Sequence, residues 1–563
     1  MLNWRSKYLL IFYLLTLSGL IFLFFHINLL EWQGHNTFGP SNIHPVGPSP
    51  LKGKQSFYRH LGQESSPEEA LKESYILESI KWPGLPDQPT PTPLEWTSDP
   101  AHSFFVIMPM DAGRAPHVGD QLEAWVIIND FKGRTKSYGG DFLIARLHSP
   151  ELGAAVAGQL LDHKNGSYTV IFPLLWEGSV QVEVTLVHSS EAIHYLHSLR
   201  ISGQDRVFYK SVFRSGPLSE TTVCNLHLPA SEQPVCDYTD IKTGEPWYCY
   251  KPKQNLSCES RINHSWGSYP TNLLTQNETL LFQGGVNIKA RIHARGSHSV
   301  TVLPKDKDKP SAESISGKGA PTKFRPSGYY LNWSWRLLSG VVVREFNPAA
   351  ITQCLKGKQM HIYGDSTARQ YYEFLTSFLP ELKDFDLKST KKAGPFLAVD
   401  VGNNIMLMYS CHSPPIAWDP ISVPQLRSVA DQLDGLVGGP DTVVIISVWA
   451  HFTTFPVEVY LRRIRHIQRA VMRLLDRAPE TLVVVRSANL RIQNPEMSPI
   501  FSDWYSLQMD VVVKAMFRDV NVFLLDAWEM TVAHHLPQNI HPQPPIIQNM
   551  INTILSHLCP EKK

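Results

Sequence analysis

Short segments in which apolar and polar residues alternate predict a β-sandwich over residues 96–203. Alternation with a period of two places the apolar side chains on one face of a strand. Turn-forming pairs such as Gly119-Asp120 separate the segments. The predicted strands are Phe104–Ile107, Leu122–Ile128, Phe142–Leu147, Tyr168–Phe172 and Val180–Leu186. Several short strands at this spacing are typical of an immunoglobulin-like sandwich.

A different pattern begins near Phe346, where continuous apolar runs alternate with segments of helical period. The predicted strands are Met360–Tyr363, Ile405–Tyr409, Thr442–Val448, Thr481–Arg486 and Val520–Leu525. The predicted helices are Ala368–Leu379, Val457–Leu474, Phe501–Phe517 and Ile546–Leu558. Residues 346–563 are therefore expected to form an α/β/α domain with a mostly parallel sheet covered on both faces. Ligands of such sheets bind beyond the C-terminal ends of the strands.

The remaining segments show neither pattern at length. Residues 31–95 are rich in Pro, Gly, Ser and Gln, which predicts a stem, with a short helix over Ser66–Ile80. Residues 204–290 hold four cysteines and predict a small cysteine-rich module. Residues 291–345 are expected to be a partly disordered linker, because Lys305–Pro310 is a run of alternating charge.

The N-terminal residues 1–30 predict a cytoplasmic tip and a signal anchor. Arg5 and Lys7 precede Tyr8–Phe25, an uncharged and almost wholly apolar run near the lower length limit for a bilayer span. The basic end is expected in the cytoplasm and the rest of the chain in the lumen, as in a type II membrane protein. The alternative is a cleaved signal peptide and a secreted protein.

Cysteines and glycosylation sequons agree with a lumenal, oxidising compartment. Cys224, Cys236, Cys249 and Cys258 lie within 35 residues and predict two disulfides, for which three connectivities are possible. The five Asn-x-Ser/Thr sequons are at Asn165, Asn255, Asn263, Asn277 and Asn332. A zinc site is the alternative for the four cysteines, but the Cys-x-x-Cys spacing that would support it is missing from the sequence.

The other three cysteines are spread over the C-terminal segment. Cys354 and Cys559 lie near its two ends and are the candidate pair, which leaves Cys411 free or bonded to another chain.

The balance of charge argues against one class of function, nucleic-acid binding. With 52 basic and 51 acidic residues the chain has no overall excess of positive charge, so composition gives no support to nucleic-acid binding.

Gly364-Asp365-Ser366 stands between the predicted strand Met360–Tyr363 and the helix that follows. A sharp strand-to-helix turn can present a serine hydroxyl as a nucleophile, and the opening N–H groups of the helix can stabilise negative charge. The alternative is that Ser366 or Asp365 only caps the helix.

Three histidines follow the last predicted strand, at the same edge of the sheet as Ser366. His534, His535 and His541 could supply a general base, with His541 standing directly before the C-terminal helix. A metal site is the alternative, but no carboxylate or cysteine accompanies the histidines over this short span, and no metal is expected.

Several stretches together resemble the neurexophilin and PC-esterase domain family. The C-terminal part carries HIYGDSTARQYYE, ISVWAHFTTFP and DAWEMTVAHH…NIHP, which resemble the PC-esterase branch of GDS-type, SGNH-like esterases and acyltransferases. YGGDFLIARL and NGSYTVIFPLLWEGSVQVEV, followed by the cysteine-rich segment, resemble neurexophilin. The likeness covers nearly everything after residue 95.

The resemblance implies roles for particular residues. Ser366 matches the nucleophile and His541 the base, while Gln538 stands where the DxxH pattern has its aspartate. Glutamine cannot supply the negative charge that stabilises an imidazolium, so Asp526 is considered as a substitute. Gly402 and Asn403 are expected at the second oxyanion donor, and His451 at a further polar contact with substrate.

The function that the resemblance implies is serine-dependent acyl transfer to glycans in the Golgi lumen, such as O-acetylation of sialic acid on glycoproteins. Acetyl-coenzyme A is the expected acyl donor, although the sequence carries no recognised nucleotide-binding signature. The alternative is an inactive binding protein whose sandwich recognises a cell-surface or secreted protein partner. A third interpretation, a carbohydrate-binding module alone, gives the C-terminal sheet edge no role.

Overall fold

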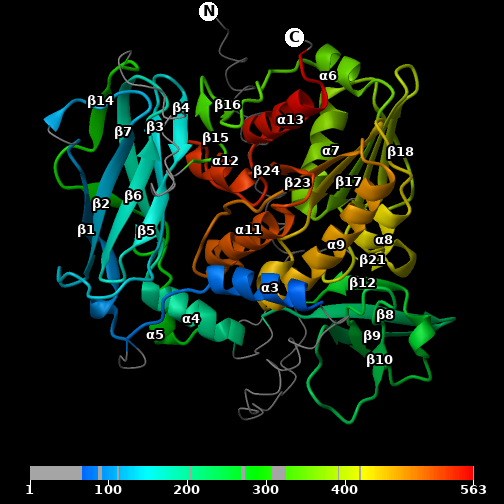
Figure 1. The fold of residues 1–563 in the computed structure, drawn as a ribbon. Coiled ribbons are helices and arrows are strands. Elements are labelled where there is room, and N and C mark those ends of the chain that lie inside the picture. The colour runs from blue at the N-terminus through cyan, green and yellow to red at the C-terminus, as the bar shows by residue number, and fades with distance from the viewer. Residues whose placement is uncertain are drawn as a thin grey trace, which may run out of the picture. The chain divides into compact units, whose positions relative to one another are not determined.

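A computed structural model describes residues 66–86, 92–110, 113–201, 206–267, 273–306, 325–390, 392–416 and 420–561 (Figure 1). The expected signal anchor over residues 8–25 and most of the stem lie outside these ranges. In the ranges described, none of the helices has both the length and the apolar character needed to cross a membrane.

The N-terminal part is dominated by antiparallel strands, as the alternating pattern predicts. In β2, Ala124, Val126 and Ile128 are buried while Glu123 and Trp125 are exposed, which is the expected period of two. The strands found at the five predicted segments are β1 (Ser98–Ile107), β2 (Gln121–Asp130), β3 (Phe142–Ser149), β6 (Ser167–Pro173) and β7 (Gly178–His188). Between β3 and β6 lie β4 (Ala154–Ala157) and β5 (Gln159–Asp162), and the helix α4 (Ser190–Ile201) follows β7.

Part of the segment expected as a linker instead completes this sheet. Its strands are β13 (Ala290–Ala294), β14 (Ser299–Val302), β15 (Gly328–Leu331) and β16 (Ser334–Leu337). β13 and β14 pair with β7, β13 also pairs with β1, and β15 pairs with β4. The expectation of a linker is wrong for these strands because each has only four or five residues, too few to show a clear period in the sequence.

The cysteine-rich module forms a second, six-stranded sheet. Cys224–Cys249 joins neighbouring strands, and Cys236–Cys258 ties the next strand to the turn before β12. The strands are β8 (Tyr209–Ser215), β9 (Leu218–Asn225), β10 (Val235–Asp237), β11 (Tyr248–Tyr250), β12 (Asn263–Trp266) and β21 (Ile421–Ser422). Because β21 belongs to the C-terminal segment, the module is hydrogen-bonded to that segment.

The C-terminal sheet has the order β18-β19-β20-β17-β22-β23-β24, and its last five strands are parallel. The strands are β17 (Gln359–Gly364), β18 (Lys383–Phe385), β19 (Phe396–Asp400), β20 (Ile405–Cys411), β22 (Thr442–Ser447), β23 (Leu482–Arg486) and β24 (Phe523–Leu525). This mixed, mostly parallel sheet confirms the predicted fold class. β19 runs antiparallel to β20, which matters for the site below.

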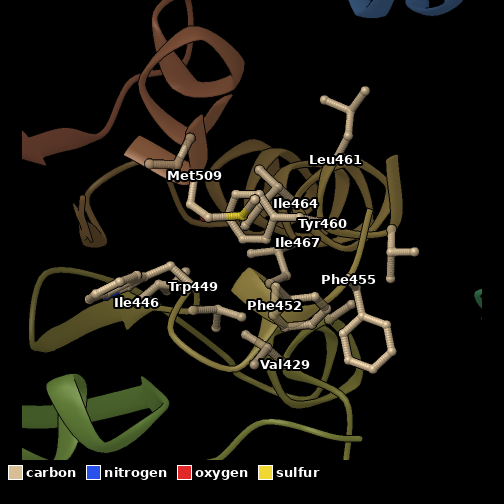
Figure 2. Close-up of a cluster of buried hydrophobic side chains, with 14 of the residues drawn as sticks. Val429, Ile446, Trp449, Phe452, Phe455, Tyr460, Leu461, Ile464, Ile467 and Met509 are labelled. Carbon is tan, nitrogen blue, oxygen red and sulfur yellow. The ribbon is translucent and has the colours of Figure 1, made fainter. Parts of the chain in front are cut away.

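Helices cover both faces of this sheet. The helices packed around it are, in chain order, α3 (Pro67–Ser79), α6 (Pro348–Leu355), α7 (Ser366–Phe378), α8 (Val429–Asp434), α9 (Val457–Arg477), α10 (Ser498–Phe501), α11 (Asp503–Phe517), α12 (Ala527–Ala533) and α13 (Pro544–Leu558). Val444 and Ile446 of β22 pack with α9 and α11, and the alternate residues Val443 and Ile445 pack with α7 and α13. Figure 2 shows the cluster that contains Ile446, in which Tyr460 of α9 lies beside Met509 of α11 and Trp449 lies near Ile446.

A third disulfide, Cys354–Cys559, joins α6 to the end of α13 and is the pair favoured from sequence. Cys411 is free and buried, and burial raises the pKa of its thiol to about 12, so the thiol is unreactive.

Four sequon asparagines are exposed, whereas Asn263 is half-buried and its Oδ1 accepts a hydrogen bond from the Val212 N–H at 2.8 Å.

Candidate active site

Ser366 lies at the C-terminal edge of the parallel sheet, where β17 turns into α7. β17 is flanked by the parallel strands β20 and β22, so the turn emerges between two neighbouring strand ends. Gly364 closes β17, Asp365 is the N-cap of α7 and Ser366 is the first helical residue. This is the strand-turn-helix arrangement that the sequence predicts.

Only glycine fits at position 364. A Cβ atom there would lie 1.9 Å from the carbonyl oxygen of Ser447, which is well inside van der Waals contact. The same carbonyl accepts a hydrogen bond from the Asp365 N–H at 3.0 Å. The missing side chain therefore allows the turn to press against the end of β22.

Asp365 carries out the capping role that was the alternative interpretation of the motif. Its fully buried carboxylate accepts hydrogen bonds from the backbone N–H groups of Thr367 at 2.9 Å, Trp449 at 3.0 Å and Ala450 at 2.8 Å. Burial raises the pKa of Asp365, but interaction with His451 and the hydrogen bonds from Thr367 and Ala450 outweigh burial and hold it below its usual value. The cap leaves the Ser366 hydroxyl free for another partner.

That partner is His541. Its Nε2 lies 2.7 Å from the Oγ of Ser366, within hydrogen-bond reach for a nucleophile and its base. The backbone N–H of Ser366 has no acceptor among the described residues, and it opens the 13-residue helix α7. A free N–H at a helix N-terminus suits an oxyanion that develops beside Ser366.

Two amide side chains, which the sequence alone does not single out, hold the loop that carries His541. Nε2 of Gln370 donates to the carbonyl of Pro542 at 3.0 Å. Nδ2 of the fully buried Asn489 donates to the carbonyl of Asn539 at 3.1 Å. Because Gln370 lies one turn after Ser366 on α7, the helix that presents the serine also positions the histidine loop.

The surroundings of His541 favour its neutral form. Burial lowers the pKa of His541 below its ordinary value, and the nearby guanidinium of Arg369 lowers it further, while Asp365 and Glu373 act in the opposite direction. Arg369 donates to Glu373 at 2.7 Å. A neutral imidazole near neutral pH is the form that can accept a proton from Ser366.

Asp526, the carboxylate considered as support for His541, and Gln538, which stands at the aspartate position of the DxxH pattern, both bond other residues. Asp526 caps α12 and accepts from Nζ of Lys514 at 2.6 Å. Oε1 of Gln538 accepts from the ammonium of Lys289, which comes from the segment just before β13. In the described ranges no carboxylate accepts a hydrogen bond from the His541 ring, so the structure brings together a Ser–His dyad without a third, charged member.

Gly402 and Asn403 lie at the wrong edge of the sheet for an oxyanion donor. They form the hairpin turn between β19 and β20, and the carbonyl of Asn403 accepts from the Gly357 N–H, two residues before β17 begins. Because this turn directly precedes β20, which runs parallel to β17, it lies at the N-terminal edge of the parallel strands. The expected second donor is therefore not supplied by these residues.

His451 follows β22 and is next to Ala450, which is tied to the carboxylate of Asp365. Its Nδ1 lies 3.0 Å from Nε2 of His412, whose Nδ1 lies 2.6 Å from the carbonyl of Ser413. A carbonyl only accepts, so Nδ1 of His412 carries a proton, and in neutral rings Nδ1 of His451 then donates to His412.

The Nε2 of His451 is consequently an unprotonated acceptor. It is buried and has no hydrogen-bond partner in the parts of the chain that the structure covers. Burial lowers the pKa of His451 to about 4, so the ring is neutral at physiological pH. In this state His451 suits a substrate hydroxyl and cannot donate to an oxyanion through Nε2. His412, the residue that sets this tautomer, was not identified from the sequence.

His534 and His535 do not join the dyad. They stack on each other with ring centroids 4.6 Å apart, and His535 lies 3.9 Å from the ring of Trp333. Within the described ranges there is no group of three or more potential metal ligands.

Two family models match the chain, one in its N-terminal part and one in its C-terminal part. Residues 68–279 match the neurexophilin family model. Residues 335–559 match the model for the C-terminal domain of NXPE family member 4-like proteins. The second match contains Ser366, His541, His412 and His451.

Replacing Gly364 with Ala should destabilise the site by about 3 kcal/mol, because the new Cβ has to displace the backbone of Ser447. Thermal or urea unfolding measures this loss. Gly402→Ala is the matched control, since a Cβ there meets nothing closer than 3.4 Å. Equal stability of the two variants would contradict the close approach of β17 and β22.

Proposed function

The chain belongs to the NXPE family, and from this premise we propose that it is a serine-dependent acyltransferase acting on glycans. The most specific form of the proposal is O-acetylation of glycoprotein sugars such as sialic acid, through an acyl-Ser366 intermediate. The observation that carries it is the 2.7 Å contact between Ser366 Oγ and His541 Nε2 at the C-terminal edge of the sheet.

In the first step His541 removes the proton from Ser366, and Oγ attacks the carbonyl carbon of the acyl donor. The negative charge on the carbonyl oxygen develops near the free N–H of Ser366 and the N-terminus of α7. Collapse of the tetrahedral adduct expels the donor's leaving group, which takes the proton from His541. Acetyl-coenzyme A, whose leaving group is a thiol, is the proposed donor.

In the second step a sugar hydroxyl attacks the acyl-serine. His541 takes the hydroxyl proton and returns it to Ser366 as the new ester leaves. The lone pair on Nε2 of His451 offers a second acceptor that can orient such a hydroxyl. Because the imidazolium gains no carboxylate partner in either step, we expect a rate below that of a full triad.

The disulfides and the neurexophilin match support a protein of the secretory pathway. The proposed location is the Golgi lumen, with residues 8–25 as a type II anchor, or secretion if that segment is cleaved. Glycoprotein acceptors are available in this compartment.

The second candidate function is an inactive binding protein whose sandwich recognises a protein partner. One observation favours it: Gln538 replaces the expected aspartate and its side chain is held by Lys289 instead of supporting His541. The two functions differ in whether Ser366 is nucleophilic.

Labelling with a fluorophosphonate, which reacts with activated serines, tests nucleophilicity without a known substrate. We expect the wild-type protein to be labelled at Ser366, Ser366→Ala to be unlabelled, and His541→Ala to react at least about 100-fold more slowly. Ser377→Ala is the matched control, because Ser377 lies on the same helix and, among the residues that the structure describes, its hydroxyl bonds only the Phe374 carbonyl. A wild-type protein that resists labelling would favour the binding function.

The labelling rate should also depend on pH in a direction set by Arg369. Since the pKa of His541 is lowered, its neutral form persists as pH falls from 8 toward 6.5, and the rate should decline only below that range. Arg369→Gln removes a positive charge that lowers this pKa, so the decline should begin at higher pH. Rate profiles of both proteins measure the shift, and a shift to lower pH would contradict the assignment of His541 as base.

A further inference from the structure

A cavity of about 350 Å³ lies beside the loop that leads to His541. One wall comes from β3 and β7 of the sandwich, with Arg146 and Glu183, and Lys289 lies next to it. The other wall is the segment His534–Gln538. The volume is at the lower end of the range found for small-molecule sites and matches a ligand of about one or two sugar rings.

The cations in this lining already have partners. The ammonium of Lys289 donates to the carbonyl of Arg491 at 2.6 Å, contacts Asp503 at 2.7 Å and also bonds Gln538, which uses its three donors. Arg146 donates to the carbonyl of His534 at 2.8 Å and to Oε2 of Glu183 at 3.0 Å. The cavity therefore offers little to an anionic ligand.

The groups that remain available are uncharged donors and one carboxylate oxygen. Arg146 and Arg291 both contact Oε2 of Glu183, and in the described part of the chain Oε1 has no partner. The amide nitrogen of Gln538 is also unused, because only Oε1 of this side chain is bonded.

His534 adds a third such group. Its Nδ1 accepts from the Leu536 N–H at 3.1 Å, so its proton is on Nε2, which has no acceptor among the residues described. The neighbouring His535 is exposed and contributes an aromatic ring to the same lining. Separated donors and an acceptor beside a ring are the features that recognise a polyhydroxylated ligand.

We propose that this cavity binds an uncharged sugar residue of a glycan. The inference deepens the proposed function, on which its link to acyl transfer rests, by giving a neutral sugar of the acceptor glycan, other than the acetylated one, a contact outside the dyad. Gln538 lies three residues before His541, so a sugar held at the cavity is anchored to the loop that carries the base. The sandwich then takes part in acceptor recognition through Glu183.

Saturation-transfer NMR on the full-length Ser366→Ala protein tests binding without any turnover. The probes are the methyl glycosides of galactose, N-acetylgalactosamine and N-acetylglucosamine, with N-acetylneuraminic acid as the anionic comparison. We expect saturable signals from at least one neutral glycoside and weaker signals from the anion. Glu183→Gln should weaken the neutral interaction about tenfold, whereas Glu123→Gln, on the exposed side of β2, should leave it unchanged.

His535→Ala provides a second variant, because an exposed side chain can be removed without unfolding the protein, and it should also weaken binding. The proposal is overturned if no neutral glycoside binds saturably, or if neither variant weakens the binding. Sugar binding without fluorophosphonate labelling of the wild type would retain this site and reject the acyltransferase. Labelling without sugar binding would retain the acyltransferase and reject this sugar site.

Discussion

The candidate site depends on one buried carboxylate. The carboxylate of Asp365 accepts hydrogen bonds from the N–H groups of Trp449 and Ala450, in the loop after β22, and Asp365 also caps α7. These bonds fix the serine helix to the neighbouring strand end. They also let a carboxylate stay ionised in a buried position, because backbone donors replace its lost hydration. The Gly-Asp-Ser motif thus has two roles on adjacent residues: Asp365 caps the helix, and Ser366 presents its hydroxyl to His541.

Local periodicity was enough to predict the elements that build this site. The apolar runs locate β17 and β22, and the histidine before α13 was correctly placed at the edge that Ser366 occupies. The short strand β19 was not predicted, and the predicted strand Ile405–Tyr409 begins after Gly402 and Asn403, which already puts these residues at the N-terminal end of that strand. The resemblance, not the periodicity, placed Gly402 and Asn403 beside the serine, and in the structure they lie at the opposite edge.

Contacts between distant parts of the chain could not be predicted from the sequence, for a different reason. Lys289 and Gln538 are 249 positions apart, and neither belongs to a pattern that would connect them. The tautomer of His451 likewise depends on His412, which follows another strand. Such pairs are set by the packing of sheets and loops, and periodicity carries information only about one element at a time.

The two members of the dyad are supported differently. Ser366 is fixed by a strand, a helix and a buried carboxylate, whereas His541 lies on a loop held by amide side chains and joined to the sandwich through Gln538 and Lys289. An aspartate at position 538 would face the ammonium of Lys289, so its charge would be engaged there before it could serve the imidazole. In this chain Gln538 serves to attach the loop, because its Oε1 accepts from Lys289, and it gives the imidazole no charge support.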